Sequence, residues 1–426
     1  MSLRIAMVGA CPYPVPQGSQ VLLGNTANAL RARGHDVHLV VYGHGMMDTR
    51  KPGSPPDALG DIPIHRCTRI PGARKTAAGP SFAKPFLDLG MVIALRRVVR
   101  DAKIDIVHAH NYEGLLVALA ARKRPIVYHA HNAMTDELPY YFRSKKTGTI
   151  PMERSEPGLS ALSPALPRRF GAWLDRTFPR RADHVIAPHE RLAKYLTQCG
   201  CASGRVSVIP PAVNADRFEE SCVADALAPV LYAGNLDAYQ NIDLLMRAMA
   251  RVRKAEPAAK LIIATNAAAA APVPDAEVVL TPDFASLRRI LVADGVFACP
   301  RVSWSGYPIK LLNAMAAGKA VVACQSAAHP ITCGLNGLVV PDNDEAAFAN
   351  RLLELMRNVR RRRELGRSAR ETVARSHSPA AIGEQISAVY AEIRKPAHAR
   401  RDERGYFGAP ASNASAECRA PREKQR

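Results

Sequence analysis

The sequence predicts an α/β protein built from two doubly wound, Rossmann-like domains that face each other across a cleft. Short apolar runs of strand length alternate with segments of helical length, a pattern typical of βαβ units around a parallel sheet. The alternation starts afresh near residue 229, which indicates a second sheet. The 426 residues suit two or three domains, and a hydrophobic content of 47% suits packed cores.

The first domain is expected over residues 1–220. It opens with a strand at 4–9, a loop rich in Pro and Gly at 11–18, a helix at 19–33 and a strand at 36–41. Because parallel strands are joined by crossovers, this order predicts a βαβ unit. The same alternation predicts later strands at 62–67, 104–108, 125–131, 184–187 and 206–209, and helices at 86–100, 113–121, 167–177 and from 190 onward. Irregular excursions are expected at 44–85 and 143–166.

The second domain is expected over residues 221–378, after a linker near 219–229. Its predicted strands lie at 229–234, 261–264, 277–280, 295–298 and 320–324, and its helices at 242–253, 284–292, 310–317 and 345–357. Residues 365–395 are mainly helical, with a break near Ser378 because Pro379 disfavours a continuous helix. The stretch 396–426 mixes charges with Gly, Ala and Ser, so we expect a disordered basic tail.

The composition narrows the classes of partner. A formal net charge of +20 favours anionic partners, although a solvated surface also explains many of the arginines. No DNA- or RNA-binding motif is visible and aromatic residues are only 6%, so no nucleic-acid partner is expected. No apolar run approaches the ~20 residues that span a bilayer, and no secretory signal precedes the first strand. We therefore expect a cytoplasmic protein, with Cys199 and Cys201 as reduced thiols.

The most informative segment runs from Cys299 to Ala323. It reads as a strand end, a loop with Ser305-Gly-Tyr-Pro, a short helix that starts near Lys310 and stops before Gly318, and a new strand. In a doubly wound sheet this order aims loop amides and a helix N-terminus at the crevice beyond the strand ends, where anionic ligands bind. The segment therefore predicts a site for a phosphate-bearing ligand.

The order of residues in this segment resembles the donor-binding segment of retaining glycosyltransferases of family 4 (group 1), which have the GT-B fold. That family commonly shows two glutamates separated by seven residues and then Ala-Met-Ala-Ala-Gly. Here Ser305 and Asn313 stand at the glutamate positions before Ala-Met-Ala-Ala-Gly318. Residues 209–218 and 232–245 are similar to the end of the family's first domain and the start of its second. The resemblance covers about residues 4–395, and it implies that residues 379–395 form a closing helix returning to the first domain.

The resemblance implies a donor site with an altered charge pattern. Asn235 and Gln240 stand where the family commonly has Arg and Lys, so neutral amides replace a cationic grip on the diphosphate. Lys310 is the candidate for the missing charge, and a solvated helix lysine is the alternative. The resemblance also implies that Ser305 and the amides of Gly306 and Tyr307 approach the sugar. Pro308 and Ile309 would shape the pocket for the base and the phosphates, and Asn313 would bond the ribose hydroxyls.

The first domain supplies the other candidates. Gly18 and Ser19 open a helix whose amides would meet a donor phosphate, although a plain helix cap by Ser19 is the alternative. His131 stands where the family has a strand-end histidine, which implies a catalytic residue whose neutral imidazole bonds a sugar hydroxyl. Glu113 is a candidate for the acceptor site, or a carboxylate that favours a helix N-terminus.

A group of histidines and a basic helix each allow two interpretations. His108, His110 and His129 lie near His131 and raise a metal site as an alternative, but no carboxylate stands at a recognisable ligand spacing, so no metal is expected. The helix at 167–178 places aromatic residues at helical spacing beside arginines. This face would suit an anionic membrane surface, or its aromatic stripe would lie in the core.

These observations predict a metal-independent, retaining glycosyltransferase without a cofactor that uses a nucleotide sugar, UDP- or GDP-linked. The expected acceptor is a cell-envelope glycan or a lipid-linked molecule. A further expected partner is the inner face of an anionic membrane, which the protein would contact peripherally. Two alternatives stay open. One is a nucleotide-sugar-binding or scaffold protein with weak or no turnover, since four positions that are charged in the family are neutral here. The other is a sugar-nucleotide epimerase, which would convert the donor without an acceptor.

Overall fold

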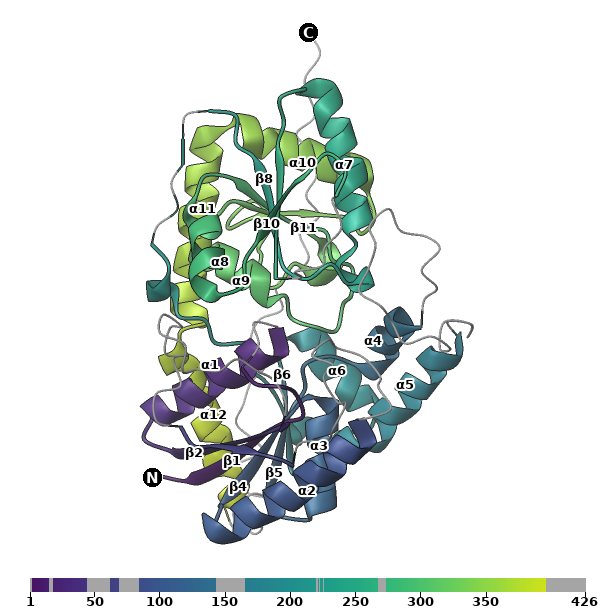
Figure 1. Cartoon of the computed structure of the whole chain (residues 1–426), viewed down its shortest axis with the longest axis vertical. Helices are drawn as coiled ribbons and strands as arrows, with labels where there is room; N and C mark the ends of the chain where they lie inside the picture. Colours follow the sequence, from purple (N-terminus) through teal and green to yellow (C-terminus); the bar gives the residue numbers. More distant parts are fainter. Residues whose placement is uncertain are drawn as a thin grey trace.

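The computed structural model describes residues 2–14, 18–43, 62–68, 84–142, 165–219, 221, 223–224, 226–266 and 273–395. Two parallel sheets, each flanked by helices, form two domains that stack along the long axis of the molecule (Figure 1). The predicted architecture of two doubly wound α/β domains is confirmed. The predicted tail at 396–426 and most of the two excursions lie outside the described residues.

The N-terminal sheet has seven strands in the order β3-β2-β1-β4-β5-β6-β7. The strands are β1 (Arg4–Gly9), β2 (Asp36–Val41), β3 (Ile64–Arg66), β4 (Ile106–His110), β5 (Ile126–His129), β6 (His184–Ala187) and β7 (Val206–Val208). The helices are α1 (Gly18–Ala32), α2 (Lys84–Asp101), α3 (Asn111–Ala121), α4 (Met134–Tyr141), α5 (Ala165–Thr177) and α6 (Glu190–Gln198). The strand order reverses between β1 and β4, so the loops after these strands part and leave room for a ligand.

The C-terminal sheet has six strands in the order β10-β9-β8-β11-β12-β13. The strands are β8 (Val230–Ala233), β9 (Leu261–Thr265), β10 (Glu277–Leu280), β11 (Val296–Cys299), β12 (Val321–Cys324) and β13 (Leu338–Val340). The helices are α7 (Ile242–Ala255), α8 (Phe284–Val292), α9 (Ile309–Ala316), α10 (Glu345–Arg357) and α11 (Val359–Ser376). Here the order reverses between β8 and β11.

The last helix, α12 (Pro379–Arg394), leaves the C-terminal domain and packs against α1 (Figure 1). The Ser378 side chain caps it by accepting from the Ala381 amide, and Pro379 occupies its first turn, where its missing N–H costs nothing. A Cβ at Gly383 would lie 2.7 Å from the carbonyl oxygen of Ala29, so glycine permits the close approach of the two helices.

Two elements were not predicted from the sequence. Helix α4 has only eight residues and contains Pro139, so no helical period is visible. Strand β13 has three residues, which is too short for an alternation to be recognised. Within the described part of the chain, no helix is long and apolar enough to cross a bilayer.

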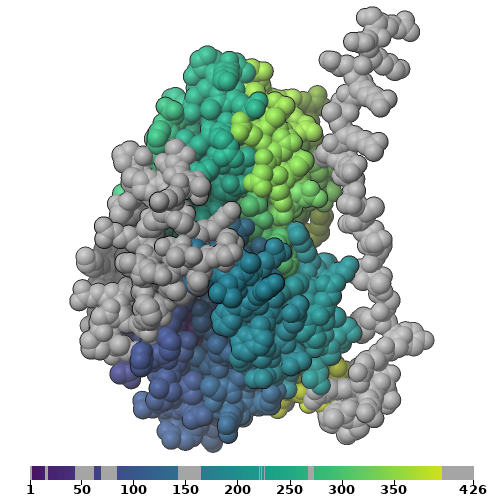
Figure 2. All heavy atoms as spheres, turned by 90° about the vertical axis from the view of Figure 1, so that its right-hand side faces the viewer, coloured from purple at the N-terminus to yellow at the C-terminus, as the bar shows by residue number. Residues whose placement is uncertain are grey.

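The two domains touch each other directly. Figure 2 shows the teal surface around residues 165–219 of the N-terminal domain against the green surface of the C-terminal domain. The N-terminal turns of α1 and α9 meet at this interface, where Val21 packs against the cluster that contains Ile309. The carboxyl ends of both sheets therefore face the interface, and ligands of doubly wound sheets bind at that end.

Candidate functional site

The predicted donor residues gather where the strand order of the C-terminal sheet reverses. Asn235 and Gln240 follow β8, and Lys310 lies in the first turn of α9 after β11. The Lys310 ammonium donates to the Tyr232 hydroxyl at 2.8 Å and to the Gln240 side-chain oxygen, and the Gln240 amide donates to Asn235 Oδ1 at 2.7 Å. The two loops are thus joined by one hydrogen-bond network that contains a single cation.

Lys310 is held in an environment that disfavours its charge. Its ammonium lies 4.4 Å from the centroid of the Tyr232 ring, and the hydrogen-bond partners found among the described residues are neutral. Burial, with a smaller contribution from the nearby Arg301 guanidinium, lowers the pKa of Lys310 from 10.5 to about 7. Nearby Cys299 and Asp237 offset only part of this effect, so the ammonium gains from a bound anion that compensates its charge.

Arg301 is a second cation at this site, and the sequence reasoning missed it. It comes directly after β11 and Pro300, and its guanidinium donates to the Ser303 hydroxyl at 3.2 Å and lies 5.0 Å from the centroid of the Tyr239 ring. A Cβ at Gly306 would overlap the Arg301 Nη2 atom, so glycine leaves the space that the guanidinium occupies. Strand-end position, the signal used for Ser305, would also have pointed to Arg301.

Ser305 contacts the other domain in this structure. Asp136 of α4 accepts three hydrogen bonds on one oxygen, from the Ser303 hydroxyl at 2.8 Å, the Ser305 hydroxyl at 2.8 Å and the Ser305 amide at 3.0 Å. His189 donates to the Ser305 carbonyl oxygen at 3.1 Å, and the Ser305 side chain is fully buried. Asp136 therefore joins the two domains and places a carboxylate beside the position that lacks one in the sequence.

Glu137, the next residue of α4, is a second carboxyl at the interface. Tyr141 donates to its Oε1, while its Oε2 is buried without a hydrogen-bond partner among the described residues. Burial raises the pKa of Glu137 to about 7, although the Tyr141 hydrogen bond and the Arg301 charge act in the opposite direction. The sequence reasoning missed both acidic residues because it did not predict α4.

The remaining donor-side predictions are arranged as follows. The Tyr307 ring packs near His189 and His329, and its hydroxyl lies 3.4 Å from His377 Nε2. Pro308 precedes the first turn of α9, and Ile309 is buried in the core. Asn313 is half-exposed, one turn beyond Lys310 on α9. Tyr307 and Ile309 therefore support the loop through packing.

On the N-terminal side, His131 lies just beyond the end of β5 and is buried. Its Nε2 lies 3.1 Å from His110 Nδ1, and its Nδ1 has no hydrogen-bond partner among the described residues. Burial, with a smaller contribution from His129, lowers the pKa of His131 well below its ordinary value. The imidazole is therefore neutral at physiological pH, as the proposed catalytic role requires.

Gly18 and Ser19 form the first turn of α1, which faces α9 across the interface. Glu113 lies in the first turn of α3, and its carboxylate accepts from the Lys84 ammonium at 2.6 Å. Burial opposes its ionisation, but the Lys84 charge and hydrogen bond outweigh burial and lower the pKa of Glu113. Glu113 is thus an ionised, paired carboxylate, and whether it meets an acceptor stays a prediction.

Two family models match this chain in succession. Residues 16–217 match the model described as Glycosyltransferase Family 4, and residues 228–358 match the model described as Glycosyl transferases group 1. The chain belongs to glycosyltransferase family 4. This agrees with the resemblance that the order of motifs indicated.

This family 4 glycosyltransferase is also similar to single proteins and to solved structures. It is 25% identical over 414 residues to the phosphatidyl-myo-inositol mannosyltransferase of Mycobacterium leprae (strain TN). The matched region covers 92% of this chain and 97% of the mycobacterial protein. Sucrose-phosphate synthase from Thermosynechococcus elongatus superposes with a TM-score of 0.70 at 17% identity over 92% of this chain and 99% of the other. Anabaena HepE with UDP and glucose gives 0.65 at 15% identity over 91% and 99%. The architecture of the family 4 glycosyltransferase is therefore GT-B.

Helix α5 of the family 4 glycosyltransferase exposes its aromatic stripe. Phe170 and Trp173 are each 52% exposed, so the prediction that placed the stripe in the core is wrong for these two rings, whereas Phe178 is partly buried against the core of the N-terminal domain. The buried face instead carries Gly171 and Asp175: a Cβ at Gly171 would overlap the Met134 carbonyl, and Asp175 accepts from two amides at the start of α4. The close packing on α4 therefore determines which face of α5 is buried, and it turns the aromatic rings outward.

Proposed function

We propose that this protein is a retaining glycosyltransferase that moves a sugar from a nucleotide-diphosphate donor to a hydroxyl of a glycan or a lipid-linked acceptor. The observation that carries the proposal is the pairing of two cations, Lys310 and Arg301, with the N-terminus of α9 where the strand order reverses. Cations and helix N-termini both favour a diphosphate. Membership of glycosyltransferase family 4 supports the reaction type.

The donor would be UDP- or GDP-linked. The Anabaena structure that shares the fold contains UDP and glucose, and the mycobacterial relative is named a mannosyltransferase, which supports a nucleotide sugar. Lys310 and Arg301 would neutralise the diphosphate, so neither a cofactor nor a metal ion is needed at this position. Asp136 would hold the domains together, and Glu137 would accept from a sugar hydroxyl through its unpartnered oxygen.

The reaction would proceed on one face of the sugar. The bond between the anomeric carbon and the diphosphate oxygen breaks while the acceptor hydroxyl oxygen bonds to the same face of that carbon. The leaving diphosphate oxygen takes the acceptor proton. His131 would stabilise the developing charge on the sugar as a neutral imidazole, and the amides of Gly18 and Ser19 would stabilise the diphosphate.

Donor screening and a hydrolysis assay test this function. We expect one of UDP-, GDP-, ADP- or dTDP-sugars to raise the Tm of the wild type, because a ligand that binds the native state stabilises it. With that donor, His131→Ala should lower turnover by about 100-fold or more, since loss of a charge-stabilising group commonly has this effect. The control is His65→Ala, which changes a half-buried histidine on the edge strand β3, away from the donor residues. Saturable binding without turnover of any nucleotide sugar would favour the scaffold reading, and conversion of the donor sugar without an acceptor would favour the epimerase.

The exposed apolar face supports peripheral binding to the cytoplasmic face of an anionic membrane. Phe170 and Trp173 of α5 stack at 5.7 Å between centroids, with arginines at 168, 169 and 176 on the same helix. Phe86 and Leu89 of α2 are 67% and 62% exposed, and both helices lie on the same side of the N-terminal domain (Figure 1). Aromatic and basic groups together favour an anionic lipid surface. The mycobacterial relative, whose name includes a phosphatidyl lipid, fits a lipid-linked acceptor.

Liposome sedimentation tests this membrane contact. We expect the wild type to sediment with vesicles that contain phosphatidylglycerol and not with pure phosphatidylcholine. The double variant Phe170→Ala, Trp173→Ala should lose most of this binding. Leu335→Ala is the control, because Leu335 is 61% exposed on the C-terminal domain. Equal sedimentation of the double variant and the control would contradict the proposal.

A further inference from the structure

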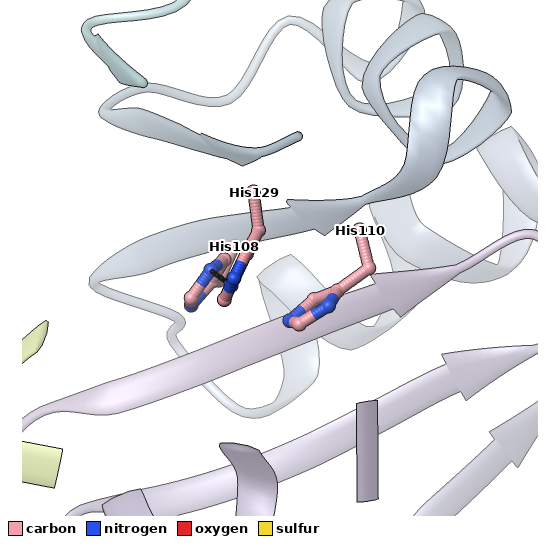
Figure 3. Close-up of side chains that lie close together, drawn as sticks. All are labelled: His108, His110 and His129. Atoms are coloured by element: carbon pink, nitrogen blue, oxygen red, sulfur yellow. Dashed lines mark hydrogen bonds between the residues drawn. The ribbon is translucent and has the colours of Figure 1, made fainter. Parts of the chain in front are cut away.

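Four histidines form a buried cluster on one face of the N-terminal sheet. His108 and His110 lie two residues apart on β4, and His129 on β5 pairs in register with His110 (Figure 3). Residues two apart on a strand share a face, so all three rings extend to the same side. His131 follows two residues after His129. The register of the strands, which cannot be seen in the sequence, brings the histidines together.

The nitrogen atoms of three of these rings lie close to one another. One ring nitrogen each from His108, His110 and His129 lies within 4.8 Å of the other two. His108 Nε2 and His129 Nδ1 are 3.2 Å apart. Zinc–nitrogen bonds of about 2.0–2.1 Å in a tetrahedral site would place the nitrogens about 3.3 Å from each other. The His110 nitrogen, within 4.8 Å of the other two, would have to come to a similar distance from them to complete a three-nitrogen site.

Two buried ring nitrogens of this group lack a hydrogen-bond partner in the part of the chain that the structure describes. The Nε2 atoms of His110 and His129 are buried and lack a hydrogen bond to any described residue. A polar atom that is buried without a partner is costly, and such atoms usually mark a bound ion, a water or a functional group. A cation bound by His108 Nε2, His129 Nδ1 and His110 Nε2 would use the buried lone pair of His110, and His129 Nε2 would then carry the ring hydrogen.

Neighbouring residues orient the rings for this use. His108 Nδ1 lies 2.5 Å from the Tyr390 hydroxyl of α12, and His110 Nδ1 lies 3.1 Å from His131 Nε2. If each Nδ1 carries the hydrogen and donates it to that partner, Nε2 of His108 and of His110 both present a lone pair. Histidines that bind metals are commonly fixed by a hydrogen bond of this kind from the second ring nitrogen.

The protonation state and the donor set agree with a transition metal. Burial lowers the pKa of His129 to about 3 and the pKa values of His108 and His110 well below their ordinary value. Neutral imidazole is the form that binds metals. Three nitrogen donors favour Zn²⁺, Ni²⁺ or Cu²⁺ over Mg²⁺ and Ca²⁺, and a water or hydroxide would complete the coordination.

We propose that His108, His110 and His129 bind one transition-metal ion per chain, with Zn²⁺ as the first candidate. The ion would stiffen β4 and β5 and, through Tyr390, fasten α12 to the sheet. The sequence analysis raised a metal site at these histidines and expected none for lack of a carboxylate ligand, but the register of β4 and β5 brings three imidazoles together without one. The ion would be structural and would lie apart from the donor residues of the C-terminal domain, although its ligand His110 is joined to His131 by a hydrogen bond. The proposal concerns metal binding and does not rest on the transfer reaction.

Metal analysis and spectroscopy of the full chain test the proposal. We expect about one equivalent of Zn²⁺ to remain after dialysis of Zn²⁺-loaded protein, and we expect Zn²⁺ to raise the Tm of EDTA-treated protein by about 3 °C or more. Co²⁺ should give the visible absorption bands of a tetrahedral site. His110→Gln and His129→Gln should reduce retained Zn²⁺ at least about tenfold, because each removes one of three ligands. The control is His65→Gln, which alters the separate pair of His38 and His65 on β2 and β3.

The outcomes separate clearly. If the cluster variants do not fold, the Co²⁺ spectrum and the Tm shift of the wild type still decide. No retained Zn²⁺ and no Tm shift in the folded wild type would overturn the proposal. Loss of Zn²⁺ in the His65 variant, with retention in the two cluster variants, would overturn it as well, since the metal would then bind elsewhere.

Discussion

Replacing Lys310 with methionine probes the donor site most directly. Methionine keeps most of the side-chain volume and removes the charge that burial disfavours. The fall of the Lys310 pKa from 10.5 to about 7, at about 1.4 kcal/mol for each pKa unit, sets a ceiling of about 5 kcal/mol on the cost of the buried ammonium. Lys310 keeps part of its surface exposed, and methionine forfeits two hydrogen bonds. We therefore expect Lys310→Met to be more stable than the wild type by about 1–2 kcal/mol at pH 6.

The gain in stability should depend on pH in a defined direction. Below pH 7 the lysine is charged in both the folded and the unfolded chain, so the full cost is present. Between about pH 7 and the unfolded pKa of 10.5, the unfolded chain still binds the proton that the folded chain has released. The stability of the wild type therefore rises with pH relative to the variant, and the difference disappears above that range. Urea unfolding at pH 6 and pH 10 measures it.

Donor binding should change in the opposite sense. Loss of one charge-assisted hydrogen bond, about 1.5–3 kcal/mol, corresponds to roughly 10- to 100-fold weaker binding of the nucleotide sugar chosen by the Tm screen. Wild-type affinity should also fall as the pH rises through 7, while the affinity of the variant stays flat. Lys254→Met, at an exposed position of α7, is the matched control for calorimetry. Unchanged donor affinity in a folded Lys310→Met protein would refute the reasoning.

Three further predictions concern contacts between elements. Asp136→Asn should lose charge-assisted hydrogen bonds worth about 1.5–3 kcal/mol across the interface. The radius of gyration of this variant in small-angle X-ray scattering should therefore increase, and an unchanged value would show that other contacts hold the domains together. Gly306→Ala should displace the flexible Arg301 guanidinium, weakening donor binding while the urea midpoint stays within experimental error. Gly383→Ala should lower stability by about 1–3 kcal/mol, because the new Cβ meets the Ala29 carbonyl, and equal stability would refute this tight packing.

The elements that the sequence predicted well are those with a clear period. Strands such as β1 and β11 and long helices such as α1 and α7 bury one face and show it in their apolar spacing. The donor residues Asn235, Gln240 and Lys310 could be placed together because their strands end at the same edge of one sheet. Local pattern and sheet geometry were sufficient for these predictions.

The contributions to the site that were missed depend on long-range contacts. Asp136 and Ser305 are 169 residues apart, and no local pattern shows that a short helix of one domain lies on a loop of the other. Arg301 is different, because its position after β11 is visible in the sequence; only the contact of its guanidinium with the Tyr239 ring depends on the fold. The histidine cluster likewise depends on the register of β4 and β5, which only the folded sheet determines.

The return of α12 to the first domain has a consequence for how the chain is made. Ile382, Ile386 and Tyr390 of α12 complete the core on the face of the N-terminal sheet that α1 also covers. On the ribosome, this sheet has all its strands once Val208 has emerged, yet that face stays partly uncovered until the whole second domain has been synthesised. We therefore expect the usual N-to-C order of domain maturation to be reversed, with the first domain becoming fully stable last.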